Sequence, residues 1–240
     1  MDSILYTSTF VGLAALTAVM YVLVVHQIRR ALEKAPWEES RRRKIFGRAV
    51  ITLVAWTLLI SALGLSGFLA DFTAFPPRIM LVLVVPLITM IIVTFSKTAT
   101  ELLAYVPSRN IAAFQIFRVF VEIILWMAFI QNLLPVQMTF EGRNFDIIAG
   151  LTAPLAAYFL AKSKKGLIIW NLVSLGLLFN IITVAVLSLP TPLRVFMNEP
   201  ANTIVATFPF VWLPGLLVPL AYGLHFLSLR QLSTHGIVDQ

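Results

Sequence analysis

Two residues of opposite charge, Arg118 and Glu122, lie four positions apart inside a long apolar stretch. In an α-helix this spacing places both side chains on one face. Gln115, Trp126 and Asn132 continue the same face at about 100° per residue. An unpaired charge at membrane depth costs at least about 2.5–3.5 kcal/mol on insertion scales, so we expect this stripe to face the interior of a helix bundle.

Two interpretations of this stripe remain open. It is either a ligand-orienting or proton-coupled site in which Glu122 titrates, or a structural pair within one helix. In the second case the pair docks its helix onto Asn171 or Asn180 of a later apolar stretch. Trp212 and Tyr222 of the last stretch complete the candidate ligand-binding residues.

The last apolar stretch contains three prolines, Pro209, Pro214 and Pro219, and each removes a backbone donor. A helix broken in this way exposes carbonyl groups that can line a cavity or bind a cation. The alternative is an ordinary proline-kinked membrane helix.

The sequence offers few residues for catalysis, metal binding or cofactor binding. The absence of cysteine excludes disulfides, thiol catalysis and Cys-ligated metals. His26 and His225 lie at matching depth and are the one option for axial haem ligation, the alternative being packing near the membrane surface. No Gly-x-Ser-x-Gly, His-Glu-x-x-His or phosphate-loop motif occurs. We therefore expect no cofactor, no metal site, no catalytic residue and no enzymatic activity.

Three acids, Asp71, Glu141 and Asp146, are expected on the outer face, and the last two share the segment 138–146 with Arg143. This segment is either a solvated turn with local ion pairs or a cap over the mouth of the bundle that faces a ligand. Residues 140–146 could also extend the apolar stretch that follows them.

The composition predicts one all-α integral-membrane domain over residues 1–240. Hydrophobic residues make up 59% of the chain and charged residues only 12%, too few to cover a soluble protein of this size. The net charge of +7 does not indicate a nucleic-acid partner, because the basic residues lie between apolar runs. No cleavable signal peptide is expected, since no basic n-region precedes the first apolar stretch.

A membrane span needs about 20 mostly apolar residues, and seven stretches qualify. Lys and Arg are distributed unevenly between the connections. Fourteen of the 18 fall on one side, three on the other, and Arg118 lies within a span. The positive-inside rule therefore predicts that the N-terminus lies outside and the C-terminus in the cytoplasm. We expect the membrane to be the plasma (inner) membrane. The predicted spans are about 4–28, 49–70, 79–95, 112–134, 147–161, 167–188 and 208–229.

The first connection, residues 29–48, is the most basic segment. Besides the bilayer itself, we expect anionic lipid or an acidic protein to bind there. A second copy of the chain or another membrane protein is a further candidate partner. Pro36 followed by two acids predicts a short helix at the membrane surface.

The segments starting at Phe75 and Phe208 share a Phe-Pro pair, eight residues and then Val-Pro-Leu. The match favours two parallel three-helix repeats joined by the fourth span, although chance remains the alternative. This 3+1+3 layout, the orientation and the length resemble the sweet-type sugar transporters in topology, without their Pro-Gln motif. A small-solute or ion-coupled transporter or binding bundle is the first expectation, and a sensory or accessory membrane subunit is the alternative.

Overall fold

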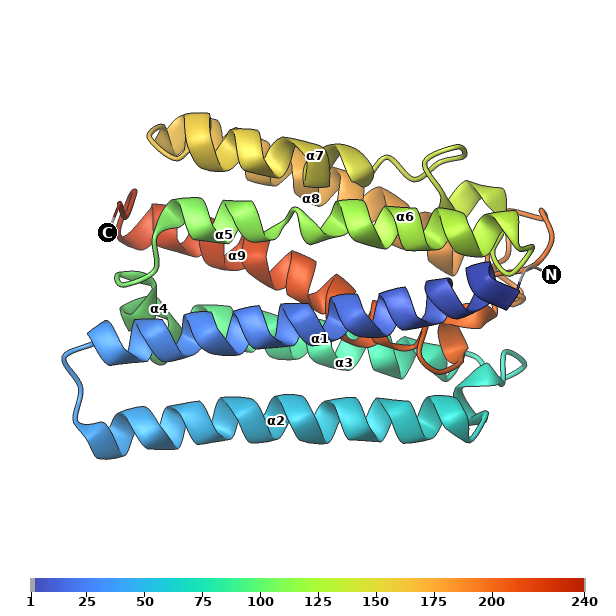
Figure 1. The fold of residues 1–240 in the computed structure, drawn as a ribbon, viewed down its shortest axis with the longest axis horizontal. Coiled ribbons are helices and arrows are strands. Elements are labelled where there is room, and N and C mark those ends of the chain that lie inside the picture. Colours follow the sequence, from blue (N-terminus) through green and yellow to red (C-terminus); the bar gives the residue numbers. More distant parts are fainter. Residues whose placement is uncertain (1–2, 240) are drawn as a thin grey trace.

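The computed structural model describes residues 3–239, and every regular element in that range is a helix (Figure 1). The long helices lie along one axis of the molecule. In chain order the elements are α1 (Ser3–Lys34), α2 (Glu39–Leu65), η1 (Phe68–Ala70), α3 (Ile79–Phe95), α4 (Lys97–Leu103), α5 (Ser108–Phe114), α6 (Phe117–Ile130), η2 (Val136–Met138), α7 (Ile147–Leu155), η3 (Ala156–Leu160), α8 (Lys164–Val186), η4 (Ile204–Ala206), η5 (Leu213–Leu217) and α9 (Val218–Thr234).

Five helical segments in the described residues are long and apolar enough to cross a membrane: α1, α2, α5 with α6, α8, and η5 with α9. The α3 and α4 helices pass the same test as a pair, with a bend of 66° between them. The α7–η3 segment is apolar but shorter. The predicted all-helical membrane fold is thus supported with five or six candidate spans, and the count of seven stays a prediction.

Burial separates the central from the peripheral helices. In the most apolar 18-residue stretch of α2, only 11% of the residues are buried. In that of the η5–α9 segment, 56% of the residues are buried. The α9 helix packs against α3, α5 and α8, and α1 packs against α6. Large apolar side chains such as Ile51 and Leu58 of α2 and Phe179 of α8 are exposed, as expected where lipid is the solvent.

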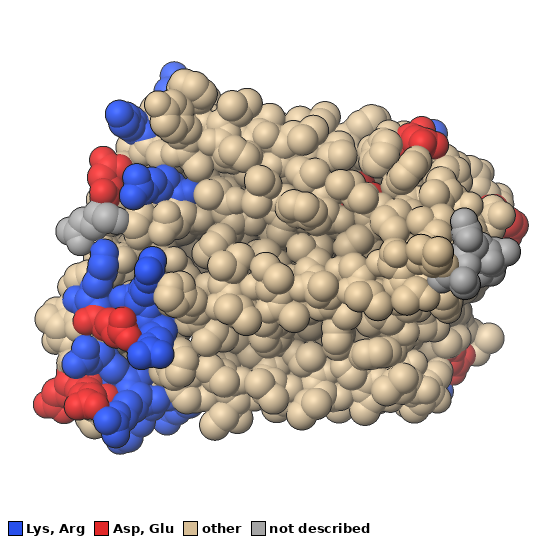
Figure 2. Space-filling view, viewed as in Figure 1, with Lys and Arg blue, Asp and Glu red and all other residues tan. Residues whose placement is uncertain are grey.

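Basic side chains gather at one end of the molecule (Figure 2). This basic end is formed by the α1–α2 connection, α4, the start of α8 and the end of α9. The N- and C-termini lie at opposite ends of the long axis (Figure 1). The connections predicted to be rich in Lys and Arg therefore share one end.

Two helices start at serine caps. The Ser96 hydroxyl accepts a hydrogen bond from the Ala99 amide at 3.1 Å, and α4 begins there in a new direction. The Ser163 hydroxyl accepts from the Gly166 amide at 3.1 Å and begins α8. Each cap satisfies an amide that has no partner within its helix.

Several predicted boundaries change. The α3 helix has the predicted bounds, but α2 already begins at Glu39. The separate surface helix predicted at Pro36 is therefore wrong, because the basic segment forms the first turns of α2 instead. The predicted fourth span is interrupted between α5 and α6, and residues 140–146 form turns rather than an extension of α7.

The proline-rich last span contains an irregular helical segment, η5, that runs directly into α9, so among the described residues it forms one continuous span rather than a broken one. Pro219 has no N–H to bond the carbonyl of Gly215 four residues earlier. The indole Nε1 of Trp56 in α2 donates to this carbonyl instead, at 2.9 Å. A Cβ at position 215 would lie 2.6 Å from Cδ1 of Ile60, so glycine permits the close approach of α2. The freed carbonyl thus has a donor, as expected for a kinked helix.

The two segments with the matching Phe-Pro and Val-Pro-Leu spacing, α3 and η5–α9, pack against each other. They differ after the shared pattern. The chain bends by 66° between α3 and α4, whereas α9 continues to Thr234. The predicted repeat stays a prediction.

Candidate functional site

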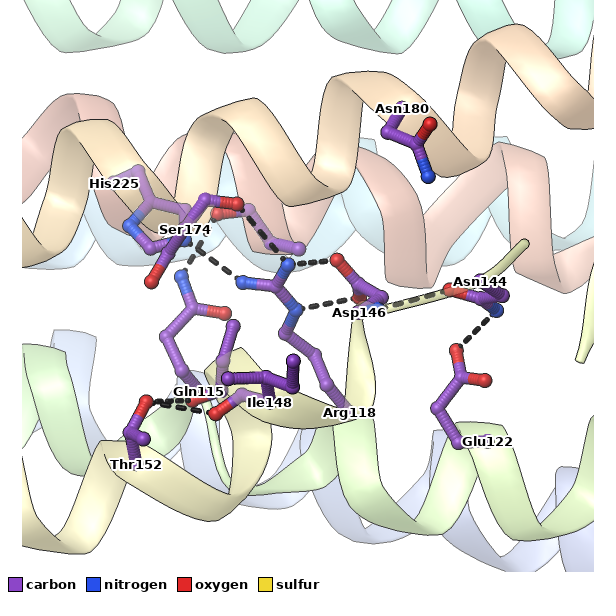
Figure 3. A network of polar contacts seen from close by, with 12 residues as sticks. Gln115, Arg118, Glu122, Asn144, Asp146, Ile148, Thr152, Ser174, Asn180 and His225 are labelled. Carbon is purple, nitrogen blue, oxygen red and sulfur yellow. Dashed lines mark hydrogen bonds and ion pairs between the residues drawn. The ribbon is translucent and has the colours of Figure 1, made fainter. Parts of the chain in front are cut away.

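Arg118, in the first turn of α6, is the largest buried polar side chain, with 2% of its surface exposed. Its Nε donates to Oδ2 of Asp146 at 2.6 Å, and its Nη2 pairs with Oδ1 of the same carboxylate (Figure 3). Two nitrogens of one guanidinium thus bind two oxygens of one carboxylate, which is a bidentate ion pair. Arg118 is thereby neutralised inside the bundle.

Asp146 was expected on the outer face, and this prediction is wrong. The residue directly precedes α7 and is 5% exposed. Residues 139–146 turn back toward the bundle, and the side chain of Asn144 accepts from the Asp146 amide at 3.0 Å. Both side chains therefore point into the bundle, where Asp146 supplies the carboxylate that a buried guanidinium requires.

The opposite side of the guanidinium faces α8 and α9. Nη1 of Arg118 lies 3.0 Å from Nε2 of His225, and Nη2 donates to the carbonyl of Ser174 at 3.3 Å. Since arginine only donates, Nε2 of His225 must accept, and Nδ1 carries the proton. That proton points to Oδ1 of Asn171 at 2.8 Å. The ring is therefore a neutral imidazole.

Asn171 completes the chain of hydrogen bonds. Its Nδ2 donates to the hydroxyl of Ser228 at 2.9 Å and to the carbonyl of Leu167 at 2.8 Å. Arg118, Asp146, Asn171 and His225 together join α6, the start of α7, α8 and α9. We call these four residues the buried network.

The haem option loses one of its two ligands in this arrangement, since both ring nitrogens of His225 are hydrogen-bonded. His26, the other histidine of that option, is exposed on α1. Among the described residues, no group of three or more His, Cys, Asp or Glu side chains is placed to hold a metal ion.

Glu122, one helical turn after Arg118, does not form the predicted pair with it, because Asp146 takes that position. Its carboxyl is 2% exposed. Oε1 accepts from Nδ2 of Asn144 at 2.6 Å, and Oε2 has no hydrogen-bond partner. Asn144 therefore connects Glu122 to Asp146, as Figure 3 shows. No cation of the described residues forms an ion pair with this carboxyl.

Gly150 in α7 permits the close contact on which this geometry depends. A Cβ at this position would lie 2.8 Å from the backbone N of Val119 and 3.3 Å from the carbonyl carbon of Arg118. Without a side chain, α7 can approach α6 closely enough for Asp146 to reach the guanidinium.

The remaining predicted site residues lie near the network or apart from it. Nε2 of Gln115 donates to the carbonyl of Ala221 at 3.0 Å, and its Oε1 has no partner. Tyr222 is half-buried and packs against the main apolar core. Nδ2 of Asn180 donates to the carbonyl of Arg143 at 2.7 Å. These three residues surround the network without joining it.

Three others do not belong to the site. Trp126 donates to Glu141 at 2.7 Å, near the end of α6. Asn132 is exposed and has φ of 57°, a left-handed conformation that asparagine tolerates after a helix. Trp212 donates to the hydroxyl of Ser61 at 2.9 Å in a separate apolar cluster with α2 and α3.

Comparison with known proteins assigns the chain to a family. Residues 76–233 match a family described as a domain of unknown function (DUF8737), and the chain belongs to that family. The match contains every residue of the buried network, whereas α1 and α2 precede it. No curated protein matches the chain, and no solved structure does.

Proposed function

We propose that this family member is a seven-span membrane protein that binds a small solute and couples its passage to a proton on Glu122. The observation that carries the proposal is the carboxyl of Glu122, which is buried and, among the described residues, has no ion-pair partner and one oxygen without a hydrogen bond. The Arg118–Asp146 pair lies next to it through Asn144.

The seven-span topology counts α3–α4 and the short α7–η3 segment as spans. An odd number of spans is favoured because the two termini lie at opposite ends of the bundle (Figure 1). The positive-inside rule places the basic end in the cytoplasm and the N-terminus outside (Figure 2). The plasma membrane is the proposed location.

The coupling chemistry follows from charge. Arg118 and Asp146 neutralise each other, so the charge of the cluster depends on Glu122. A carboxylate buried without a partner costs several kcal/mol, and a proton or an approaching cationic group removes that cost. Gain or loss of one proton at Glu122 would therefore change the hydrogen bonding of Asn144 and the field at Asp146.

Proteoliposomes with an internal pH-sensitive dye test this proposal. A gradient of benzoate, alanine or glucose is imposed in turn, and liposomes without protein correct for the protons that benzoic acid carries across the bilayer unaided. We expect at least one gradient to drive additional proton movement in the wild type. Glu122→Gln should abolish that movement, because the amide cannot exchange a proton. Glu101→Gln is the matched control, since Glu101 is exposed and pairs with Arg41 at the basic end. Unchanged proton movement in Glu122→Gln would refute the proposal.

A sensory or accessory subunit is the second candidate, and the basic end is the observation that favours it. Residues 41–44 are four consecutive basic residues in the first turns of α2, and the outer surface of α2 is largely open. An acidic protein or anionic lipid fits this surface. Neutralising residues 41–44 should then weaken co-purification of a partner, while Glu122→Gln should leave it unchanged.

A further inference from the structure

A cavity of about 450 Å³ opens at the end of the molecule opposite the basic end. It lies between the turn at residues 142–145, the last turns of α8 and the loop that contains Phe196. A volume in this range accommodates a small organic molecule. Its lining includes Arg143, Phe145, Asn180, Thr183, Leu187 and Phe196.

The cavity carries a positive charge without a carboxylate partner. At the same end, Arg78 pairs with Asp71 at 2.9 Å and Arg194 with Glu199 at 3.0 Å. Arg143 has no ion pair among the described residues, and its guanidinium carbon lies 5.1 Å from the ring centroid of Phe196. No acidic side chain lines the cavity. The free N–H groups of a guanidinium are a ready site for an oxyanion.

The remaining walls define the rest of the ligand. Three lining side chains are apolar, those of Phe145, Leu187 and Phe196. The hydroxyl of Thr183 adds one small polar group. The backbone is held in place, because Nδ2 of Asn180 donates to the carbonyl of Arg143 at 2.7 Å. A ligand with one carboxylate and a compact apolar body satisfies both parts of the surface.

The turn between the cavity and Glu122 alternates its side chains. Arg143 and Phe145 are exposed and line the cavity, whereas Asn144 and Asp146 are buried. Asn144 contacts Glu122, and Asp146 contacts Arg118. A ligand bound to Arg143 would therefore contact residues 143–146, the segment that also supplies the partners of Glu122 and Arg118.

We propose that this cavity binds a small monocarboxylate with an apolar body through the guanidinium of Arg143. The role of this ligand as the transported solute rests on the proposed function, while its binding does not. The segment 143–146 is the physical connection between the two.

Calorimetric titration of the purified protein in a neutral detergent tests the binding, with benzoate as the probe and benzamide as its uncharged isostere. We expect benzoate to bind and benzamide to bind at least tenfold more weakly. Arg143→Gln should weaken benzoate binding at least tenfold, and Arg143→Lys, which keeps the charge without the fork, should lose less. Arg78→Gln is the matched control and should bind as the wild type does.

The calorimetric inference is overturned by no benzoate binding, by equal binding of benzoate and benzamide, or by full binding to an Arg143→Gln variant of unchanged thermal stability. A phospholipid phosphate is the other source of an oxyanion. Native mass spectrometry with phosphatidylglycerol distinguishes it, because lipid retained by the wild type, lost in Arg143→Gln and not displaced by benzoate would contradict a monocarboxylate site.

The two proposals fail separately. Benzoate binding that survives in Glu122→Gln, together with unchanged proton movement in that variant, would refute only the coupling. If benzoate binding does not depend on Arg143 while proton movement still depends on Glu122, only the ligand site is refuted.

Discussion

Two regions of the bundle place polar groups where water is scarce, and they satisfy them in different ways. Around Arg118, charged and amide side chains from four elements form a continuous network. At the η5–α9 junction, one carbonyl freed by Pro219 receives one indole N–H from Trp56. The first region pairs charged side chains inside the bundle, whereas in the second a neighbouring helix supplies the donor for one backbone carbonyl.

The difference shows which kind of irregularity marks a site. Three prolines make the last span the most unusual stretch of the sequence, yet its exposed carbonyl has a structural partner. Glu122 lies in a regular helix and still has an unpartnered oxygen. Buried polar groups normally find partners. Six buried side-chain atoms of the described residues lack one, and the Glu122 oxygen is the one among them that belongs to a carboxyl group.

The largest expected effect is the removal of one member of the buried ion pair. Asp146→Ala should lower the free energy of unfolding by about 3–5 kcal/mol, because it leaves the Arg118 charge buried and unpaired. Titration of the purified protein with a denaturing detergent measures this loss. The double variant Arg118→Met/Asp146→Leu should recover part of it, and a double variant as unstable as the sum of both single variants would contradict the pairing.

The next effect concerns the helix contact that supports the pair. Gly150→Val should cost about 1–3 kcal/mol, since any Cβ there meets the backbone of α6. Gly176→Ala in α8 is the control, because nothing lies within 4 Å of a Cβ at that position. If both variants unfold at the same detergent concentration as the wild type, α7 does not approach α6 as described.

The junction at Gly215 should respond less. Trp56→Phe removes one hydrogen bond and should cost about 0.5–1.5 kcal/mol. Pro219→Ala restores an N–H that can reach the Gly215 carbonyl within the helix, so the cost of Trp56→Phe should shrink in that background. A double-mutant cycle in detergent measures the coupling energy between the two positions. A coupling energy of zero would contradict the claim that the Trp56 indole replaces the N–H that Pro219 lacks.

The smallest effect is expected at the exposed pair Arg78–Asp71, which is the surface counterpart of Arg118–Asp146. Hydrogen bonds from the side chain and the amide of Thr73 hold the pKa of Asp71 below its ordinary value. The stabilisation is therefore present at neutral pH and fades as acidification takes the pH down through that lowered pKa. Asp71→Asn should leave the unfolding midpoint at neutral pH nearly unchanged, and a shift comparable to that of Asp146→Ala would undo the contrast.

Much of the fold followed from local patterns. The bounds of α3 and the start of α7 at Ile147 matched the apolar stretches, because span length and turn residues are encoded locally. The break between α5 and α6 did not follow, since the residues around Gln115 contain neither proline nor glycine. There the packing of α5 against α9 and of both helices against α7 outweighs local preference.

The site was predicted in part. The depth of Arg118 predicts that it has a partner, and the acid that the sequence indicates is the nearest one on the same helix, Glu122. The true partner, Asp146, is 28 residues away, in a polar segment that resembles a solvated turn. Only the fold of that turn reveals that alternate residues face inward. His225 showed the right depth, but nothing in its local sequence indicates Arg118.

Infrared difference spectroscopy during a pH titration in lipid tests the central claim most directly, by following the C=O stretch of a protonated carboxyl shielded from water. The account predicts a band that appears on acidification in the wild type, persists in Glu101→Gln and is absent from Glu122→Gln. The same band in wild type and Glu122→Gln would contradict the claim that Glu122 is the proton-binding group of the bundle.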